Sequence, residues 1–323
     1  ALLEKNITQE HTVVATMKGA DLVGATYQPL YNPANFGTEI QRFVRSESVT
    51  GTPITELTPV TELDPHVVSA EFVSMDDGTG VVHIAPAFGD EDLGLGREEQ
   101  LAFVQPVDLL GNITGNYPFA GKFVKDADRD IMNDLRDRGL LFHRDVYRHT
   151  YPFCWRCDTP LLYYAKNSWY IRTSALKDQL VEGNGEINWY PDYIKDGRFG
   201  EWLRNNVDWA ISRERYWGTP IPIWQCQECP ESICIGSVQE LKDHSAPGDG
   251  AKMDDLDLHR PYIDDILLNC PADGCNGQLH RIPEVMDAWF DSGAMPFAQW
   301  HTLGLDDVDK LEDEGKFPAD YIC

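Results

Sequence analysis

The chain has 323 residues, of which 42% are hydrophobic and 11% aromatic, which excludes a fibrous or disordered protein and is enough for two or three folded units. The sequence contains no apolar run near the roughly 20 residues that span a bilayer, and its N-terminus lacks the layout of a signal peptide. We therefore expect a cytoplasmic protein with no membrane partner. Because the chain begins with Ala1, we also expect a piece of a longer protein.

The net charge of −26 argues against a nucleic-acid partner, because phosphate binding normally depends on lysine and arginine. The charge is unevenly distributed, however. Residues 144–225 carry 11 basic and 10 acidic side chains, so nearly all of the excess acid lies outside this band. The band is the stretch best suited to face a polyanion, although an ordinary mixed-charge surface explains it more simply.

In chain order, the first predicted elements belong to a mixed α/β or β-rich unit over residues 1–145. Residues 13–17 and 66–68 are rich in β-branched and apolar side chains and predict strands. Residues 126–139 predict a helix, because apolar side chains recur there at helical spacing and a glycine ends the pattern.

The segment Gly78–Asp92, GTGVVHIAPAFGDED, places one histidine and three acids along a glycine-rich stretch. Residues 76–78 favour a turn and residues 81–84 a short strand, which puts His83 near a strand end and the acids on the following loop. Such residues are typical of a functional site. A buried strand with one satisfied histidine and a solvated acidic turn fits this window equally well.

From residue 146 onward the chain is dense in tryptophan and tyrosine, which we expect to pack in the core of a connector between domains. Residues 199–211 predict a helix. The glycine and prolines of residues 218–222 would end it, because proline cannot continue a helix.

Eight cysteines in a chain of this kind favour metal binding over disulfides. Cys226 and Cys229 form one knuckle and Cys270 and Cys275 a second, and two knuckles can close a tetrahedral Cys₄ zinc site. Cys234 is a rival fourth ligand, because the second spacing is wider than usual. The site would be structural, since four protein ligands leave no open position for water. Free thiols are the alternative.

A further knuckle, formed by Cys154 and Cys157, has no matching pair nearby. Three interpretations stay open: its partners lie outside this chain, it is a bare dithiol, or it shares a metal with Cys226 and Cys229. A redox role is weakly supported, because no thioredoxin-like pattern surrounds the knuckle.

Two longer segments resemble a known family. Residues 209–224, WAISRERYWGTPIPIW, closely resemble the segment by which class I aminoacyl-tRNA synthetases for branched aliphatic amino acids re-enter their catalytic core after a large editing insertion. Residues 286–293, MDAWFDSG, resemble a later strand and loop of that core. Within the family, Gly78–Asp92 and residues 195–200 resemble the isoleucyl branch, and the valyl branch is the alternative.

The resemblance implies a mixed α/β chain in four parts. A partial, β-rich editing domain would cover residues 1–145, and a connector that re-enters the catalytic core would cover residues 146–225. A zinc-ribbon-like insertion would follow over residues 226–285, and part of a Rossmann-like core over residues 286–323.

The resemblance also implies a chemistry, which is hydrolysis of the ester that joins a wrong amino acid, chiefly valine, to tRNA(Ile). Asp92 would anchor the α-ammonium group of the substrate. His83 would line the side-chain pocket or, alternatively, orient water. Trp289 would lie near the amino-acid pocket of the synthetic site, unless it is a core tryptophan beside a glycine turn.

Neither the HIGH-type nor the KMSKS-type motif of the family occurs in the sequence. We therefore expect ATP, magnesium and isoleucine activation to belong to the full-length enzyme, and the threonine-rich peptide of the editing site to lie upstream of Ala1. The implied partners are tRNA(Ile), isoleucine and mischarged valine, and we expect a monomer. A catalytically silent tRNA-docking module is the alternative to a proofreading esterase.

Overall fold

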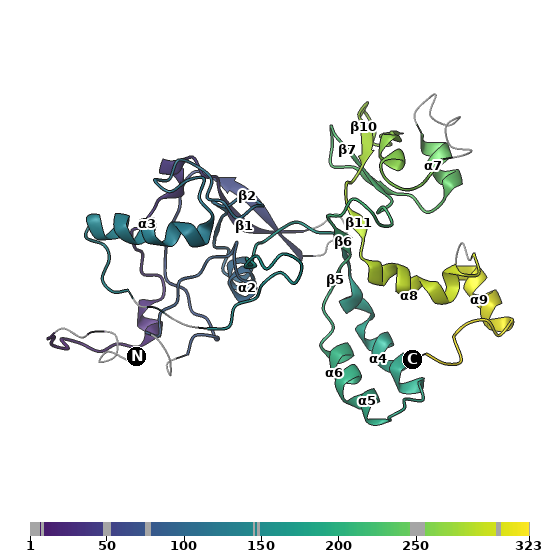
Figure 1. Cartoon of the computed structure of the whole chain (residues 1–323), viewed down its shortest axis with the longest axis horizontal. Coiled ribbons are helices and arrows are strands. Elements are labelled where there is room, and N and C mark those ends of the chain that lie inside the picture. The colour runs from purple at the N-terminus through teal and green to yellow at the C-terminus, as the bar shows by residue number, and fades with distance from the viewer. Residues whose placement is uncertain are drawn as a thin grey trace. The chain divides into compact units, whose positions relative to one another are not determined.

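The computed structural model describes residues 7, 10–47, 53–74, 79–144, 146, 149–245, 256–301 and 305–322. The chain divides into two compact units, Ala1–Lys166 and Asn167–Cys323, and each is described by itself (Figure 1). Helices and antiparallel strands occur in both units, which confirms the expected mixed α/β class. Among the described residues, every helix is too short or too polar to cross a membrane.

The first unit is built on a three-stranded antiparallel sheet in the order β2-β1-β3. β1 (Ile40–Glu47) pairs along its whole length with β2 (Pro53–Val60), and its first residues pair with β3 (Ala102–Val104). Phe43 and Phe103 meet edge to face across this sheet, with 5.7 Å between their ring centroids, and form a small buried cluster with neighbouring apolar side chains.

The helix α3 (Val124–Asp137) confirms the helix predicted over residues 126–139. A second buried cluster includes residues of this helix. Ala127 is completely buried against Tyr117 and Phe119. The chain turns out of the helix at Gly139, whose φ of 68° lies in the left-handed region that favours glycine. The short 3₁₀ helices η1 (Gly19–Leu22) and η2 (Pro33–Phe36) precede the sheet.

The hydroxyl of Tyr31 donates a hydrogen bond of 2.6 Å to Asp134 on α3. Burial and this hydrogen bond raise the pKa of Tyr31 to about 12, because both favour the neutral phenol. The folded pKa therefore exceeds the unfolded value of about 10, so the stabilisation is complete below pH 10 and is lost as the pH rises through 10 toward 12.

We expect Tyr31→Phe to remove this pH-dependent contribution. Denaturant unfolding of the first unit, followed from neutral pH to about pH 11, should show a weaker alkaline loss of stability than in the wild type. Tyr27→Phe, at a tyrosine that is 55% exposed, is the control. An unchanged alkaline slope in Tyr31→Phe would contradict the assignment.

Three strands predicted for the first unit are wrong. Residues 13–17 and 81–84 form no strand, and residues 66–68 form only an isolated bridge. These runs have strand propensity but pair with no neighbouring strand in the described part of the unit, and propensity alone does not hold a strand. The turn predicted at residues 76–78 lies outside the described residues.

The second unit begins with a helical group, in which α6 packs against α4 and α5. The bounds are β4 (Tyr170–Ile171), η3 (Thr173–Leu176), α4 (Lys177–Glu186), α5 (Tyr193–Asp196), α6 (Arg198–Arg204), β5 (Trp209–Ala210) and β6 (Ser212–Arg213). The helix predicted over residues 199–211 is therefore wrong beyond Arg204. The Asn206 side chain donates instead to the carbonyl of Thr173, and asparagine favours such local bonds over helix continuation.

A four-stranded antiparallel sheet in the order β8-β7-β10-β9 follows (Figure 1). The bounds are β7 (Ile223–Cys226), β8 (Ser232–Cys234), α7 (Val238–His244), η5 (Tyr262–Asp265), β9 (Leu268–Asn269) and β10 (Gln278–Arg281). Trp224 is the largest side chain in its core, where it is 1% exposed and its Nε1 donates a bond of 2.8 Å to the carbonyl of Ile266.

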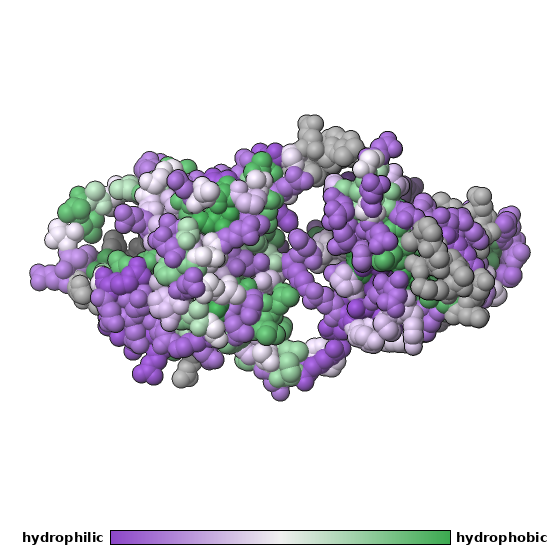
Figure 2. Space-filling view, turned by 90° about the horizontal axis from the view of Figure 1, so that it is seen from above, coloured by the Kyte–Doolittle hydropathy of each residue, from purple (hydrophilic) through white to green (hydrophobic). Residues whose placement is uncertain are grey.

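The chain then pairs β11 (Val285–Met286) with β6 and continues into α8 (Ala288–Ala298) and α9 (Leu305–Asp313). Although α8 is strongly apolar, none of its residues is buried. The expectation that the aromatic residues of the connector form a core is also wrong for many of them, since Tyr190 is 99% and Trp217 68% exposed. Figure 2 shows hydrophobic residues reaching a mostly hydrophilic surface.

Candidate functional site

The acids of the Gly78–Asp92 segment do not lie on a loop as predicted. Asp90, Glu91 and Asp92 form the first turn of α2 (Asp90–Glu98), which begins directly after the extended residue Gly89. Acidic side chains are stabilised at this position, because the first N–H groups of a helix lack helical partners and the helix dipole is positive there. The corrected placement puts the three carboxylates at one helix N-terminus.

Asp92 folds back over the start of its own helix. Its Oδ2 accepts a hydrogen bond of 3.0 Å from the backbone N–H of Ala85. A Cβ at Gly89 would lie 3.1 Å from the Asp92 carboxyl group. Glycine at this position therefore leaves room for the Asp92 side chain. Oδ1 accepts no hydrogen bond from the described residues, and the side chain is half-buried. One carboxylate oxygen is thus anchored and the other is open to a ligand.

His83 lies in the irregular segment that leads to Ala85, and its side chain is exposed. The segment starts in a tight turn, in which the Thr79 hydroxyl accepts a hydrogen bond from Val81 N–H and donates one to the Val81 carbonyl. The Ala85–Asp92 bond therefore ties the loop that carries His83 to the start of α2. A direct bond between His83 and Asp92 is not among the contacts of the described residues.

In the second unit, Asp287 joins the two segments that carry the family resemblance, and sequence reasoning missed it. Its carboxylate pairs with the Arg213 guanidinium, accepts a bond of 3.4 Å from Trp209 Nε1, and caps α8 through the N–H of Trp289 at 3.1 Å. Asp287 is only 7% exposed. An aspartate just before an apolar helical run is an N-cap signal that could have identified it.

Trp289 lies in the first turn of α8 and is 75% exposed. The alternative prediction, that Trp289 is a core residue, is therefore wrong within the described part of the chain. Asp291, in the same turn, accepts a hydrogen bond of 2.9 Å from the Thr219 hydroxyl. Asp287 and Asp291 together join the start of α8 to residues 209–224, and the indole ring of Trp289 stays exposed.

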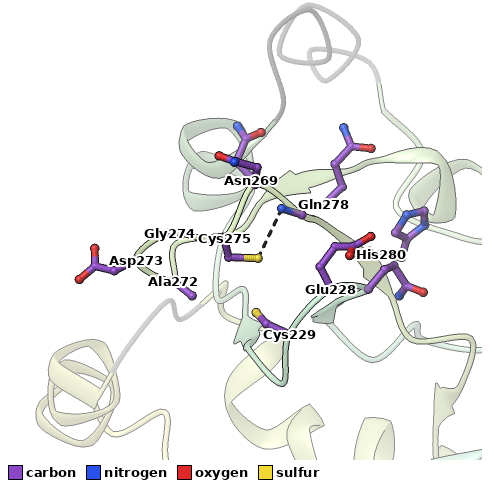
Figure 3. A pocket seen from close by; sticks show the side chains of 12 residues that line it. Glu228, Cys229, Asn269, Ala272, Asp273, Gly274, Cys275, Gln278 and His280 are labelled. Carbon is purple, nitrogen blue, oxygen red and sulfur yellow. Dashed lines mark hydrogen bonds between the residues drawn. The ribbon is translucent and has the colours of Figure 1, made fainter.

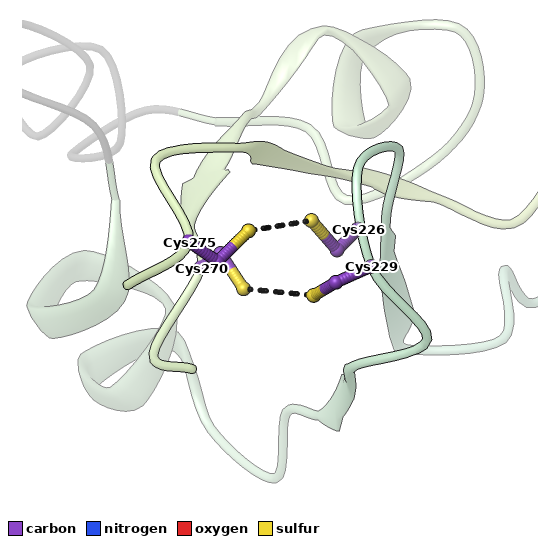
Figure 4. A group of neighbouring side chains, drawn as sticks. All are labelled: Cys226, Cys229, Cys270 and Cys275. Atoms are coloured by element: carbon purple, nitrogen blue, oxygen red, sulfur yellow. Dashed lines mark hydrogen bonds between the residues drawn. The ribbon is translucent and has the colours of Figure 1, made fainter. Parts of the chain in front are cut away.

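Four of the predicted metal ligands, Cys226, Cys229, Cys270 and Cys275, come together at the end of the four-stranded sheet. Their sulfur atoms all lie within 4.8 Å of one another and point toward a common centre (Figure 4). The Sγ atoms of Cys226 and Cys275 are 3.7 Å apart, and those of Cys229 and Cys270 are 3.5 Å apart. Cys234, the rival ligand, is exposed and is not part of this group.

The backbone around the four sulfurs is shaped for thiolates. The N–H of Glu228 donates to Cys226 Sγ, and the N–H of Gly277 donates to Cys275 Sγ, both at 3.4 Å. The bond to Cys275 Sγ is the dashed line in Figure 3. A Cβ at Gly277 would lie 2.7 Å from Cys226 Sγ, so only glycine fits there. A cavity of about 900 Å³ with a mostly polar lining opens beside the knuckles.

The pKa values of the thiols respond to this setting. The hydrogen bond from Glu228 N–H lowers the pKa of Cys226 to about 7. Burial, together with the three neighbouring sulfurs, raises the pKa of Cys270 to about 12. Four sulfurs this close cannot all ionise without a cation between them, because like charges disfavour each other.

Cys154 and Cys157 lie on a hairpin of the first unit, closed by a bond of 2.9 Å from Cys154 N–H to the Thr159 carbonyl. Hydrogen bonds with the Thr159 side chain and backbone, and one with Cys154, lower the pKa of Cys157. Within the described residues, these two cysteines belong to no group of three or more metal ligands.

Residues 6–323 match the family described as tRNA synthetases class I (I, L, M and V), and the chain belongs to that family. The relatives reported next are isoleucine–tRNA ligases. The isoleucine–tRNA ligase of Dehalococcoides mccartyi (strain CBDB1) is 51% identical over 314 residues, which cover 97% of this chain and 30% of the relative. The isoleucine–tRNA ligase of Bacillus thuringiensis (strain Al Hakam) is 43% identical over 318 residues, which cover 98% and 28%.

A third relative, the isoleucine–tRNA ligase of Streptomyces avermitilis, is 50% identical over 258 residues, which cover 80% of this chain and 24% of the relative. The chain thus spans about a third or less of the length of the curated relatives it matches. These names support the isoleucyl branch and do not favour the valyl alternative.

Proposed function

We propose that this chain is a piece of an isoleucine–tRNA ligase and that its first unit takes part in proofreading, by hydrolysing valine wrongly esterified to tRNA(Ile). The observation that carries the ligase assignment is the 51% identity to such a ligase along 97% of the chain. The division into an editing domain (1–145), a connector (146–225), a zinc-ribbon-like insertion (226–285) and part of a Rossmann-like core (286–323) belongs to the same proposal.

Asp92 supports the proofreading assignment. An aminoacyl ester carries a free α-ammonium group, which pairs best with an ionised carboxylate. Asp92 holds one oxygen on Ala85 N–H and keeps the other open, so its position is fixed before a substrate arrives. Asp90 and Glu91, in the same helical turn, are exposed to solvent.

His83 would stand beside the bound amino acid and exclude isoleucine by its bulk. One missing methylene in a hydrophobic pocket is worth only about 1 to 3 kcal/mol of discrimination, so a synthetic site for isoleucine also accepts some valine. A second pocket that rejects the larger side chain can destroy what the synthetic site lets through. Alternatively, His83 would orient the attacking water, which needs only modest help because the ester is already activated.

The Cys₄ group would hold a structural zinc ion. Zinc bound to four thiolates at about 2.3 Å requires sulfur atoms about 3.8 Å apart. The separations of 3.5 Å and 3.7 Å come close to that requirement. The ion would cross-link two loops that are distant in sequence, without a catalytic role, since no coordination position remains open. A metal role for Cys154 and Cys157 would require ligands beyond these two.

In the complete enzyme, ATP and magnesium would serve isoleucine activation, and Trp289 would border the amino-acid pocket. The start of α8 supports this role, because Asp287 and Asp291 hold the helix while the indole of Trp289 stays exposed. tRNA(Ile), isoleucine and mischarged valine are the proposed partners.

Asp92→Ala in the full-length enzyme tests the proofreading assignment. Loss of a charge-assisted contact worth about 1.5 to 3 kcal/mol should slow valine release from Val-tRNA(Ile) by about 10- to 150-fold and leave isoleucine activation unchanged. Glu91→Ala, which removes a neighbouring exposed acid, is the matched control.

Valine release at the wild-type rate in Asp92→Ala would reject the assignment of Asp92 to the proofreading site. Valine release by the wild-type enzyme no faster than the uncatalysed rate would support a catalytically silent tRNA-docking unit. Because Asp92 also holds Ala85, the melting temperature should be measured alongside. Asp92→Asn retains an acceptor for Ala85 N–H and separates loss of charge from loss of the loop.

A further inference from the structure

The loop Glu214–Trp217 carries two exposed aromatic rings, and each contacts a basic side chain: Trp217 contacts His259 and Tyr216 contacts Arg260. The Trp217 indole stacks on the His259 imidazole, with 4.7 Å between centroids and an interplanar angle of 4°. The Arg260 guanidinium lies 5.6 Å from the centroid of the Tyr216 ring. Tyr216 is 64% and Trp217 68% exposed, so much of both rings faces solvent.

Hydrogen bonds and ion pairs hold the two side chains that contact the rings, Arg260 and His259. Arg260 donates to the carbonyl of Arg215 at 3.1 Å and to Asp264 at 2.8 Å. Asp264 is also paired with Arg281, whose side chain is completely buried. His259 is fixed by Asp257, which accepts from its backbone N–H at 2.9 Å and contacts its Nδ1 at 2.7 Å. The two side chains that contact the rings, His259 and Arg260, are therefore both held by hydrogen bonds.

Beside the rings, the structure has a cavity of about 270 Å³, large enough for one flat heterocycle. Its lining includes Tyr216 and the side chains of Arg215 and Arg260, together with Glu214 and Glu284. The two glutamates offset the two guanidinium groups, so the surface is not a strongly cationic patch. Stacking, rather than phosphate neutralisation, is the interaction that this surface offers.

We propose that Tyr216, Trp217, His259 and Arg260 form a stacking platform for unpaired nucleotides, and that its occupant is the unpaired 3′ end of the tRNA. The proposal rests on the proposed function for the identity of the nucleic acid. Exposed aromatic rings with adjacent arginines are a surface on which unpaired bases stack, whereas a base pair inside a duplex presents no free face.

The test measures binding of complete tRNA(Ile), and of tRNA(Ile) trimmed of its unpaired 3′ nucleotides, to the 323-residue chain by fluorescence anisotropy. Loss of one stacked base is worth roughly a 5- to 150-fold change in affinity. Trp217→Leu should therefore weaken binding of complete tRNA by that factor and leave binding of trimmed tRNA unchanged. Trp217→Phe, which keeps a smaller ring, should lie between.

Trp202→Leu is the matched control, because Trp202 is 63% exposed in the same unit but packs at a tilt on Phe199 and lies outside the platform. It should leave both affinities unchanged. Arg260 is the one guanidinium group of the platform, and stacking is its main interaction. The logarithm of the ratio of complete-tRNA to trimmed-tRNA affinity should therefore fall with the logarithm of salt concentration with a slope of no more than about 1.

Equal loss for complete and trimmed tRNA in Trp217→Leu, or no loss for either, would overturn the proposal. Displacement of the tRNA end by ATP alone would also overturn it, since the platform would then serve a mononucleotide. None of these measurements involves ester hydrolysis. Failure of the Asp92→Ala prediction would leave this inference standing, and the converse also holds.

Discussion

Replacing Cys270 with serine is expected to unfold the four-stranded sheet of the second unit, while the first unit keeps its structure. The strands of this sheet are short, and the four cysteines join loops that frame them. A structural zinc ion in such a module contributes roughly 10 to 16 kcal/mol of apparent binding free energy, which is folding free energy because the unfolded chain has no preformed site. Removal of the ion by a chelator should have the same effect.

The measurement is metal content per chain together with hydrogen exchange of the β7 and β10 amides. One zinc ion per chain is expected, with loss of protection in Cys270→Ser. Cys234→Ser, at an exposed cysteine of β8 outside the group, is the control and should retain both metal and protection. Absence of zinc from the wild-type protein would contradict the proposal, and two ions per chain would assign a metal to Cys154 and Cys157 as well.

Trp224→Ala is expected to destabilise the same module by about 3 to 5 kcal/mol, the range for removing a large aromatic side chain from a packed core. Trp224 is 1% exposed and packs among Leu268 and Leu279, both completely buried. The substitution also leaves the Ile266 carbonyl without its bond from Nε1. Denaturant unfolding of the metal-loaded protein, followed by hydrogen exchange in β7, measures the loss.

Two controls separate the contributions. Trp224→Phe keeps most of the volume and should cost about 1 to 3 kcal/mol, chiefly from the lost hydrogen bond. Trp202→Leu, at a largely exposed ring, should change stability by no more than about 0.5 kcal/mol. Equal effects of Trp224→Ala and Trp202→Leu would contradict the core assignment.

Local sequence patterns predicted several features correctly. The helix over residues 126–139 follows from apolar spacing and a terminal glycine, both of which act within a few residues of the chain. The cysteine knuckles are short turns, and they too depend only on residues that are close together in the sequence. The segments at residues 209–224 and 286–293 pointed to the synthetase family, which the match over residues 6–323 confirms.

Predictions from local patterns failed where the secondary structure depends on the presence or absence of contacts with segments that are distant in sequence. Residues 13–17 and 81–84 have strand propensity but pair with no strand in the described part of the chain, and the predicted helix from Phe199 stops at Arg204, where Asn206 bonds to Thr173. Strand pairing and such cross-links join segments that are far apart in sequence. Composition and periodicity carry no information about them.

The sequence by itself determined the family and the mixed α/β class, and it identified the four cysteines whose sulfur atoms come together in the fold. Only the tertiary structure decided that Cys275 rather than Cys234 completes the sulfur group, and that Asp287 joins the two family segments. It also showed that Asp92 lies in the first turn of α2, where one of its carboxylate oxygens accepts a hydrogen bond from Ala85 N–H. The physical reason is that residue type sets what a side chain can bind, whereas its neighbours in space set which partner it meets.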